Sequence, residues 1–223
     1  MALSGPRLEP SNGKATHLVV LCHGYGADGK DLIELAPHWQ NALPGAVFVA
    51  PNAPQRCPGA GYQWFPISRI DPHEMHKGVE GAAGLLEAFV HAELARLALA
   101  PDRLALVGFS QGTMMTLHVG LRGSVRPAAI VGFSGLLTGA TPLEGQIPPV
   151  LLTHGDADSV IPPEALFMTA GALGAAGVRV QWHLSQGLGH GIDETALALA
   201  GGFLTQAFGG RLAPSGEACC TLR

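Results

Sequence analysis

A glycine-flanked serine between a strand-like run and a helix-like segment is the feature that most constrains how this chain can fold. Residues 103–107 are Arg-Leu-Ala-Leu-Val, which indicates a buried strand, and residues 113–119 are typical of a helix. Between them, residues 108–112 are Gly-Phe-Ser-Gln-Gly. In a strand–turn–helix setting, G-x-S-x-G presents a nucleophilic serine, because the two glycines allow a tight turn. The alternative is a glycine-rich turn in which Ser110 only caps the helix.

A serine hydroxyl needs a neighbouring base at neutral pH, and the base needs a group that orients it. Downstream of Ser110, Asp156 and Asp158 follow an apolar run, and His190 stands between glycines after a further strand-like run. Both places follow strand ends, where an open α/β sheet has its ligand site. Asp158 is favoured as the acid because one residue separates it from the Val-Ile-Pro segment that begins the next helix. Asp156 is interpreted as a turn residue. For His190, the alternative interpretation is a solvent-exposed loop histidine without a catalytic role.

The other histidines are interpreted as structural or exposed. His154 ends a strand beside the acid loop and is assigned to packing or to the turn. Residues 73–76, His-Glu-Met-His, resemble a zinc-binding motif. However, H-E-x-x-H has its second histidine one position later, where Lys77 stands. We therefore expect no metal site and no cofactor.

A second glycine-rich loop, residues 23–31, follows a strand-like run and has three interpretations. Its glycines match a dinucleotide-binding pattern, but the next strand-like run ends without the required acid. Residues 24–30 imitate a phosphate-binding loop, although Asp31 stands where a Ser or Thr should hold magnesium. The preferred interpretation is an oxyanion loop, in which the main-chain amides of Tyr25 and Gln111 donate hydrogen bonds to developing negative charge.

Composition limits the remaining classes. A chain of 223 residues has the length of one α/β domain, and 47% hydrophobic against 13% charged residues indicates a large buried core. A net charge of −4 argues against the basic surface of a nucleic-acid-binding protein. Stable membrane insertion is not expected, because no apolar run is long enough to span a bilayer. The N-terminus lacks a signal-peptide pattern and the cysteines form no disulfide framework, so we expect a cytoplasmic protein.

Strand-like and helix-like segments alternate along the chain, which indicates a mostly parallel sheet with helices on both faces. The expected strands are 17–22, 46–50, 103–108, 128–133, 149–154 and 178–184, and the expected helices are 28–39, 75–99, 111–121, 162–175 and 192–207. We expect one domain over residues 1–223, with a core of about 14–208 and a flexible tail of 209–223 that contains Cys219 and Cys220.

Four motifs together resemble the small carboxylesterase/acyl-protein thioesterase family of α/β-hydrolases, whose bacterial members are often called phospholipase/carboxylesterase proteins. The motifs are residues 21–29, 108–112, 154–162 and 189–190, and the resemblance runs from about His17 to Phe208. Thr113 and Cys22 depart from the usual pattern at positions away from the reacting groups. The resemblance implies a single-domain α/β-hydrolase with these site residues: Ser110 as nucleophile, Asp158 as acid, His190 as base, and the Tyr25 and Gln111 amides as oxyanion donors.

The resemblance implies hydrolysis of carboxylic esters with short to medium acyl chains through an acyl-enzyme. Acyl-protein thioesterase or lysophospholipase activity is the alternative, and the resemblance is compatible with a homodimer.

The resemblance also places residues 56–67 over the site, with Trp64 and Phe65 beside the acyl chain. These residues are too rich in Pro and Gly for a regular element. Leu136 and Val160 are further expected wall residues. Few basic side chains stand nearby, only Arg56 and Arg69, which favours simple esters over phospholipids. A non-catalytic receptor on the same scaffold is the alternative of a different class.

Overall fold

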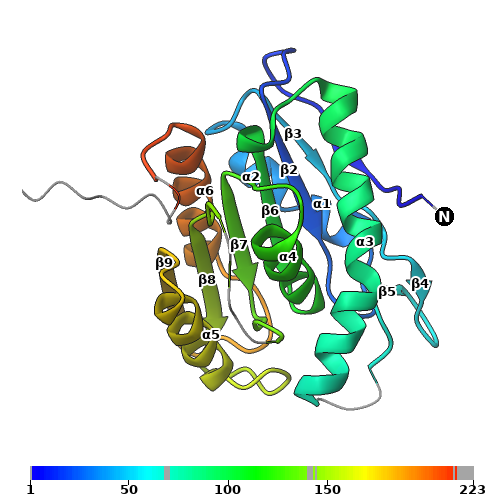
Figure 1. Cartoon of the computed structure of the whole chain (residues 1–223), viewed down its shortest axis with the longest axis vertical. Coiled ribbons are helices and arrows are strands. Elements are labelled where there is room, and N and C mark those ends of the chain that lie inside the picture. The colour runs from blue at the N-terminus through cyan, green and yellow to red at the C-terminus, as the bar shows by residue number, and fades with distance from the viewer. Residues whose placement is uncertain (1, 68–70, 140–142, 144, 213, 215–223) are drawn as a thin grey trace, which may run out of the picture.

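A single mixed sheet forms the centre of the molecule. The computed structural model describes residues 2–67, 71–139, 143, 145–212 and 214. Within them, seven strands lie in the order β1-β3-β2-β6-β7-β8-β9, and all neighbours are parallel except β1, which pairs antiparallel with β3 (Figure 1). The strands are β1 Arg7–Leu8, β2 His17–Cys22, β3 Ala46–Val49, β6 Leu104–Phe109, β7 Ala129–Phe133, β8 Val150–Gly155 and β9 Val180–Ser185.

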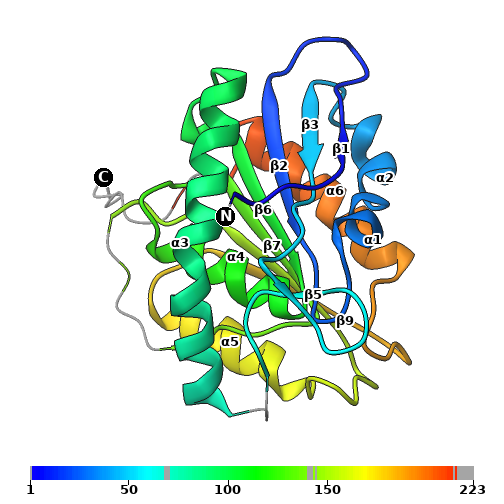
Figure 2. The ribbon, with the colours of Figure 1, turned by 90° about the vertical axis from the view of Figure 1, so that its right-hand side faces the viewer.

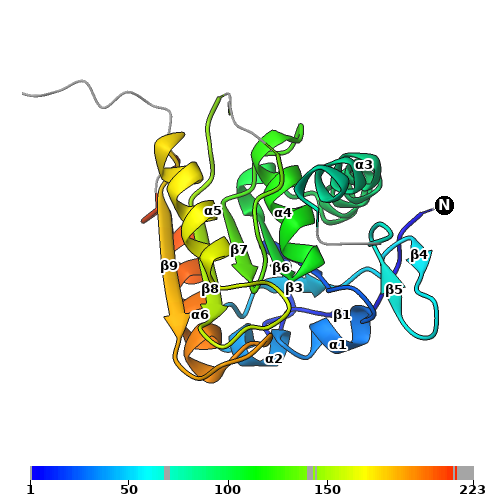
Figure 3. The same cartoon turned by 90° about the horizontal axis from the view of Figure 1, so that it is seen from below.

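Helices cover both faces of this sheet. The long helix α3 lies with α4 and α5 on one face, and α1, α2 and α6 lie on the other (Figures 2 and 3). The helices are α1 Gly29–Ile33, α2 Ala36–Gln40, α3 Pro72–Leu97, α4 Gln111–Arg122, α5 Glu164–Ala175 and α6 Glu194–Phe208. The predicted α/β-hydrolase architecture is confirmed. No helix of the described residues is both long and apolar enough to cross a membrane.

The central strands are apolar at successive positions because both sides of the sheet are covered. In β2, Leu18 and Val20 pack into the core beneath α3 and α4, whereas Val19 and Leu21 pack into the core beneath α1, α2 and α6. All four side chains are fully buried. A strand buried on both faces shows no alternation of polar and apolar residues, which is typical of parallel sheets between helical layers.

Three predicted segments differ from the structure. The expected helix over 28–39 is divided into α1 and α2, because Pro37 has no N–H to donate to the carbonyl of Ile33 and instead stands in the first turn of α2. The core begins before residue 14, since β1 adds an edge strand. The expectation of no regular element in 56–67 is wrong, because β4 Gln55–Arg56 and β5 Tyr62–Gln63 form a short hairpin.

The core continues a few residues past its expected end at 208. Helix α6 ends at Phe208, one residue beyond the expected end. Leu212 is still buried, against the core that α6 covers. Residue 213 and residues 215–223, which include Cys219 and Cys220, lie outside the described residues.

Candidate active site

Ser110 sits in a strained turn between β6 and α4. Its backbone has φ 54° and ψ −116°, a left-handed conformation that is costly for a residue with a side chain and that recurs at functional sites. The Ser110 hydroxyl makes no capping hydrogen bond to α4, so the helix-cap alternative is wrong. A Cβ on Gly108 would collide with the main chain of Gly112, and a Cβ on Gly112 would collide with the Cys22 carbonyl. Both glycines are therefore required by the close packing of the turn.

Thr113 fastens this turn to the neighbouring strands. Its hydroxyl lies 2.8 Å from both the Gly108 and the Phe133 carbonyl oxygens, and the Phe133 carbonyl also accepts the Ser110 N–H at 2.9 Å. A Cβ on Gly132 or Gly135 would press against the Thr113 side chain, so these glycines supply the space for it. The departure from the family pattern at 113 thus adds a buried contact beneath the serine.

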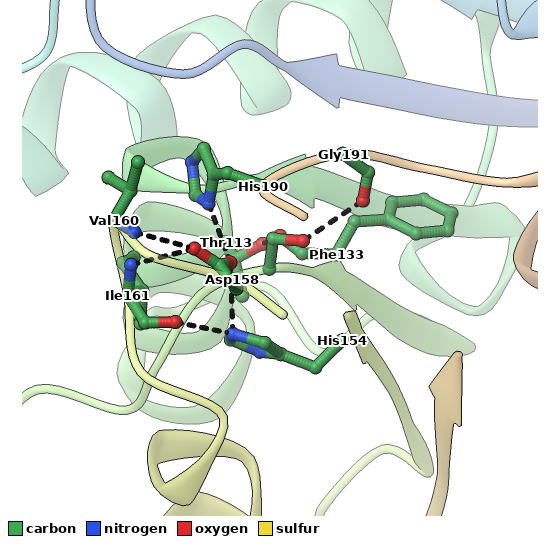
Figure 4. Close-up of polar contacts among 9 residues, drawn as sticks. Thr113, Phe133, His154, Asp158, Val160, Ile161, His190 and Gly191 are labelled. Atoms are coloured by element: carbon green, nitrogen blue, oxygen red, sulfur yellow. Dashed lines mark hydrogen bonds and ion pairs between the residues drawn. The ribbon is translucent and has the colours of Figure 1, made fainter. Parts of the chain in front are cut away.

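Asp158 is held by hydrogen bonds to both carboxylate oxygens. Oδ2 lies 2.7 Å from His190 Nδ1, and Oδ1 accepts the N–H groups of Val160 and Ile161 at 2.8 and 2.9 Å (Figure 4). Burial alone would raise the pKa of Asp158. The hydrogen bonds from His190, Ile161 and Val160 outweigh it and hold the pKa below its ordinary value. Asp156 instead accepts the Gly187 N–H at 2.6 Å and stays exposed, which fits the turn role predicted for it.

His190 stands on the loop after β9, close to the serine turn. Its ring centroid lies 5.0 Å from that of Phe109, the residue directly before Ser110. Since Nδ1 bonds Asp158, Nε2 is the ring atom left to face a hydroxyl. Within the described residues no hydrogen bond joins the Ser110 and His190 side chains, and such contacts often tighten only when substrate binds.

Ser134 anchors the His190 loop, a contact that sequence reasoning did not anticipate. Its hydroxyl donates to the Gly191 carbonyl at 3.0 Å, and its own φ of 47° is left-handed. The Ser134 N–H also bonds the Thr153 carbonyl at the end of β8. Because β7 and β8 thereby hold the loop of β9, the histidine is positioned by the sheet and not by its loop alone.

The loop after β2 passes close to Ser110 at Gly24. An added Cβ on Gly24 would come within 3.2 Å of the Ser110 Cβ. His23 fixes this loop: Nδ1 donates to the Gly24 carbonyl at 2.7 Å, and Nε2 accepts the Ala53 N–H at 2.9 Å. Burial lowers the pKa of His23, which keeps the imidazole in the neutral form that this pair of bonds requires. Gln111 opens α4, so its N–H has no carbonyl within the helix to bond.

Trp64 and Phe65 do not line the site, which corrects the expectation for these two residues. Both are buried in the core beneath α3, and Phe65 packs directly against Gly78. The Gln111 side chain fixes their position, since its Oε1 accepts the Trp64 N–H and its Nε2 donates to the Phe65 carbonyl, both at 2.8 Å. The Trp64 indole N–H bonds the His23 carbonyl at 3.0 Å. Trp64 thus supports the loop after β2 through this bond.

An apolar cavity of about 260 Å³ opens at Ser110. Leu136 and Val160 contribute to its wall as predicted, whereas Met75 of α3 and Met114 of α4 were missed. Its lining is Tyr25, Ile67, Met75, Ser110, Gln111, Met114, Leu136, Val160 and Ile161. A second cavity of about 330 Å³ shares Met75 and Leu136 with the first and is otherwise lined mainly by residues of 136–139 and α5.

Two charged residues near the site, Arg56 and Asp28, already have partners. The Arg56 guanidinium stacks 4.1 Å from the centre of the Tyr62 ring, while Arg69 lies outside the described residues. Asp28 caps α1 and accepts the N–H groups of Lys30 and Asp31, so the amides that would bind a phosphate in a nucleotide loop are occupied. In the described part of the chain, no group of three or more His, Cys, Asp or Glu side chains is arranged to hold a metal ion.

Ser110 stands in a strained turn after β6, and the Asp158–His190 pair lies on the loops after β8 and β9. All three thus follow the carboxyl ends of strands in a mostly parallel sheet, and this arrangement defines an α/β-hydrolase. The chain belongs to the phospholipase/carboxylesterase family, whose profile matches residues 3–207. Membership of this family makes it an esterase-type hydrolase, and the resemblance drawn from the sequence is confirmed.

Named relatives span nearly the same length. Acyl-protein thioesterase 1 of Neurospora crassa is 28% identical, and the match covers 92% of this chain and 93% of that protein. Among solved structures, esterase PE8 is 43% identical with a TM-score of 0.87, covering 93% of this chain and 100% of that one. Arabidopsis thaliana SOBER1, at 23% identity over 86% of this chain and 98% of its own, shares the fold with a TM-score of 0.76.

Proposed function

We propose that this chain is a serine hydrolase that cleaves carboxylic esters through an acyl-enzyme. Ser110 is the nucleophile, His190 the general base and Asp158 the acid that orients the base. The observation that carries the proposal is the 2.7 Å contact between Asp158 and His190 Nδ1, at the sheet edge where Ser110 is held in a strained turn. The proposed substrate is a small ester or thioester, and a homodimer remains a prediction of the family resemblance.

The proposed reaction follows from these contacts. Because Nδ1–H is donated to Asp158, His190 Nε2 carries the lone pair that accepts the Ser110 proton as the hydroxyl attacks the ester carbonyl. The amides of Tyr25 and Gln111 stabilise the oxyanion, and losing one such donor costs about 10²–10³ in turnover in a well-studied case. The protonated His190 then gives its proton to the leaving alcohol or thiol. Water, activated by the same imidazole, releases the acid.

The cavity favours an aliphatic acyl group. Its wall beside Ser110 is formed by Met75, Met114 and Leu136, and the second cavity extends the apolar surface beyond Met75 and Leu136. Each methylene buried there contributes about 0.8 kcal/mol. We place carboxylic esters first because esterase PE8, at 43% identity, is more similar to this chain than the Neurospora crassa thioesterase, at 28%. Thioesters and lysophospholipids come second. For lysophospholipids the further reason is that Arg56, the described basic side chain that could bind a phosphate headgroup, already stacks on Tyr62.

Acyl length provides a test of this substrate class. Along a series of p-nitrophenyl esters, kcat/KM should rise by up to about fourfold per methylene until the cavities are full. Leu136→Trp should move the optimum to shorter chains, because Leu136 borders both cavities. Leu85→Trp, at an exposed position on α3, is the matched control and should leave the optimum unchanged. If kcat/KM did not change along the series, or if Leu136→Trp left the optimal acyl length unchanged, the proposed acyl site would be wrong.

A fluorophosphonate probe separates the proposed enzyme from a non-catalytic receptor on the same scaffold. Such probes react with a serine only when a base and an oxyanion site activate it. We expect covalent labelling of the folded protein, mapped to the peptide that contains Ser110, and no labelling after heat denaturation. A folded protein that binds esters without being labelled would support the receptor.

A further inference from the structure

A second imidazole contacts the acid of the proposed triad. His154 is buried at the end of β8, and its Nε2 lies 3.1 Å from Asp158 Oδ2 and 2.8 Å from the Ile161 carbonyl oxygen (Figure 4). A carbonyl oxygen can only accept a hydrogen bond, so His154 Nε2 must carry its hydrogen. That hydrogen is donated to the Ile161 carbonyl, and the same nitrogen lies within ion-pair distance of Asp158 Oδ2.

The Asp158 carboxylate is therefore surrounded by donors. Oδ2 faces His190 Nδ1 and His154 Nε2, and Oδ1 faces the two loop amides described above. The Asp158 side chain has 0% exposure, so water does not complete this arrangement from outside. A protonated carboxyl would direct its O–H at one of four donors, and the ionised form is the one that all four contacts favour.

The four donors differ in what they are attached to. The amides of Val160 and Ile161 belong to the same loop as Asp158, and His190 is the group that has to be oriented. Of these four donors, only His154 belongs to a strand of the central sheet. It lies on β8, where it is paired with Leu184 of β9. It is therefore the contact that links Oδ2 to a central strand of the sheet, and its hydrogen bond to Ile161 connects it to the cavity wall.

We propose that His154 is a positioning residue, whose Nε2–H holds Asp158 Oδ2 against His190 and takes part of its negative charge. The inference rests on the proposed function. Of the titratable groups nearby, Asp156 bonds the Gly187 N–H on the surface, and His183 stands on β9 near Asp193. Within the described residues, His154 and His190 are the titratable side chains that contact the Asp158 carboxylate.

Three substitutions separate this role from simple packing. In His154→Gln, the side-chain amide keeps an N–H donor near the position of Nε2. In His154→Asn, the amide N–H lies near the position of Nδ1 instead. His154→Phe keeps a ring but has no donor. The Phe and Asn variants should lose about tenfold in kcat with KM changed less than about twofold. The acid limb of the kcat/KM profile, where His190 becomes protonated, should move up by about half a pH unit in these two variants. The reason is that Oδ2, having lost a donor, keeps more negative charge and stabilises the His190 imidazolium more strongly. His154→Gln should keep both values near those of the parent protein.

The measurement is the pH profile of ester hydrolysis, together with the same profile for His183→Gln, which should match the parent. A folded fraction that is constant with pH scales the whole profile and leaves the midpoint of the acid limb in place, and circular dichroism over the same pH range checks that the fraction is constant. If Ser110→Ala is inactive while His154→Phe keeps the parent kcat and acid limb, the positioning role is wrong. Equal loss in all three variants with an unmoved acid limb would also overturn it. Substantial activity in Ser110→Ala would instead overturn the proposed function.

Discussion

Ser110→Ala is expected to lower the kcat of ester hydrolysis by about 10⁶, leaving only what the oxyanion amides and binding contribute. The proposed reaction passes through a covalent bond to the Ser110 oxygen, and alanine has no atom that can form it. The fold should persist, because alanine tolerates the backbone at φ 54° no worse than serine and the hydroxyl caps no helix. Initial rates on p-nitrophenyl butyrate, with circular dichroism of the same sample, measure both quantities.

Ser159→Ala is the matched control for this experiment. Ser159 is exposed and follows Asp158 directly, so the variant carries the same chemical change beside the site without touching the proposed nucleophile. It should hydrolyse the ester at a rate close to that of the parent protein. If the folded Ser110→Ala variant kept more than about a few per cent of the rate, Ser110 could not be the nucleophile.

Asp158→Asn is expected to reduce kcat by about 10⁴. All four contacts of the carboxylate are with donors, so the amide NH₂ of asparagine must face one of them. An NH₂ in the place of Oδ2 would make His190 Nδ1 the acceptor and put the hydrogen on Nε2, where it blocks proton transfer from Ser110. Steady-state kinetics of the purified variant at pH 7 to 8 measure the loss.

Asp156→Asn tests whether the correct aspartate has been assigned. Among the described residues, the Asp156 carboxylate accepts one hydrogen bond, from the Gly187 N–H, and an asparagine oxygen can accept the same bond. Its kcat should therefore stay within about threefold of the parent value, since exposed substitutions of this kind have small effects. A larger loss in Asp156→Asn than in Asp158→Asn would transfer the acid role to Asp156.

Local sequence was sufficient to predict the parts of the site that depend on neighbours in the chain. The turn at Ser110 follows from two glycines between a strand and a helix, and both glycines are in steric contact where the prediction places them. The choice of Asp158 over Asp156 agrees with the contact to His190. Six of the seven strands of the central sheet were predicted within two residues, most of them because burial on both faces leaves long apolar runs, whereas the edge strand β1 and the hairpin β4–β5 were missed.

The errors concern contacts between residues distant in sequence. Trp64 and Phe65 were expected at the cavity because loop aromatics often line sites, but the Gln111 side chain, more than 40 residues away, draws their main chain into the core. Ser134 reaches the His190 loop across 57 residues. The contact between His154 and Asp158 spans only four positions, yet spacing alone gave no signal, because it depends on how the chain turns after β8.

Gln111 couples two properties that an engineer would prefer to change separately. Its main-chain amide is the proposed partner of the oxyanion, while its side chain holds the segment at Trp64 and Phe65 that supports the opposite loop. A substitution there would disturb both reactivity and the scaffold around it. Libraries intended to broaden the range of accepted acids should therefore keep 111 constant and vary Leu136 and Val160, whose side chains border the cavity without a structural duty of this kind.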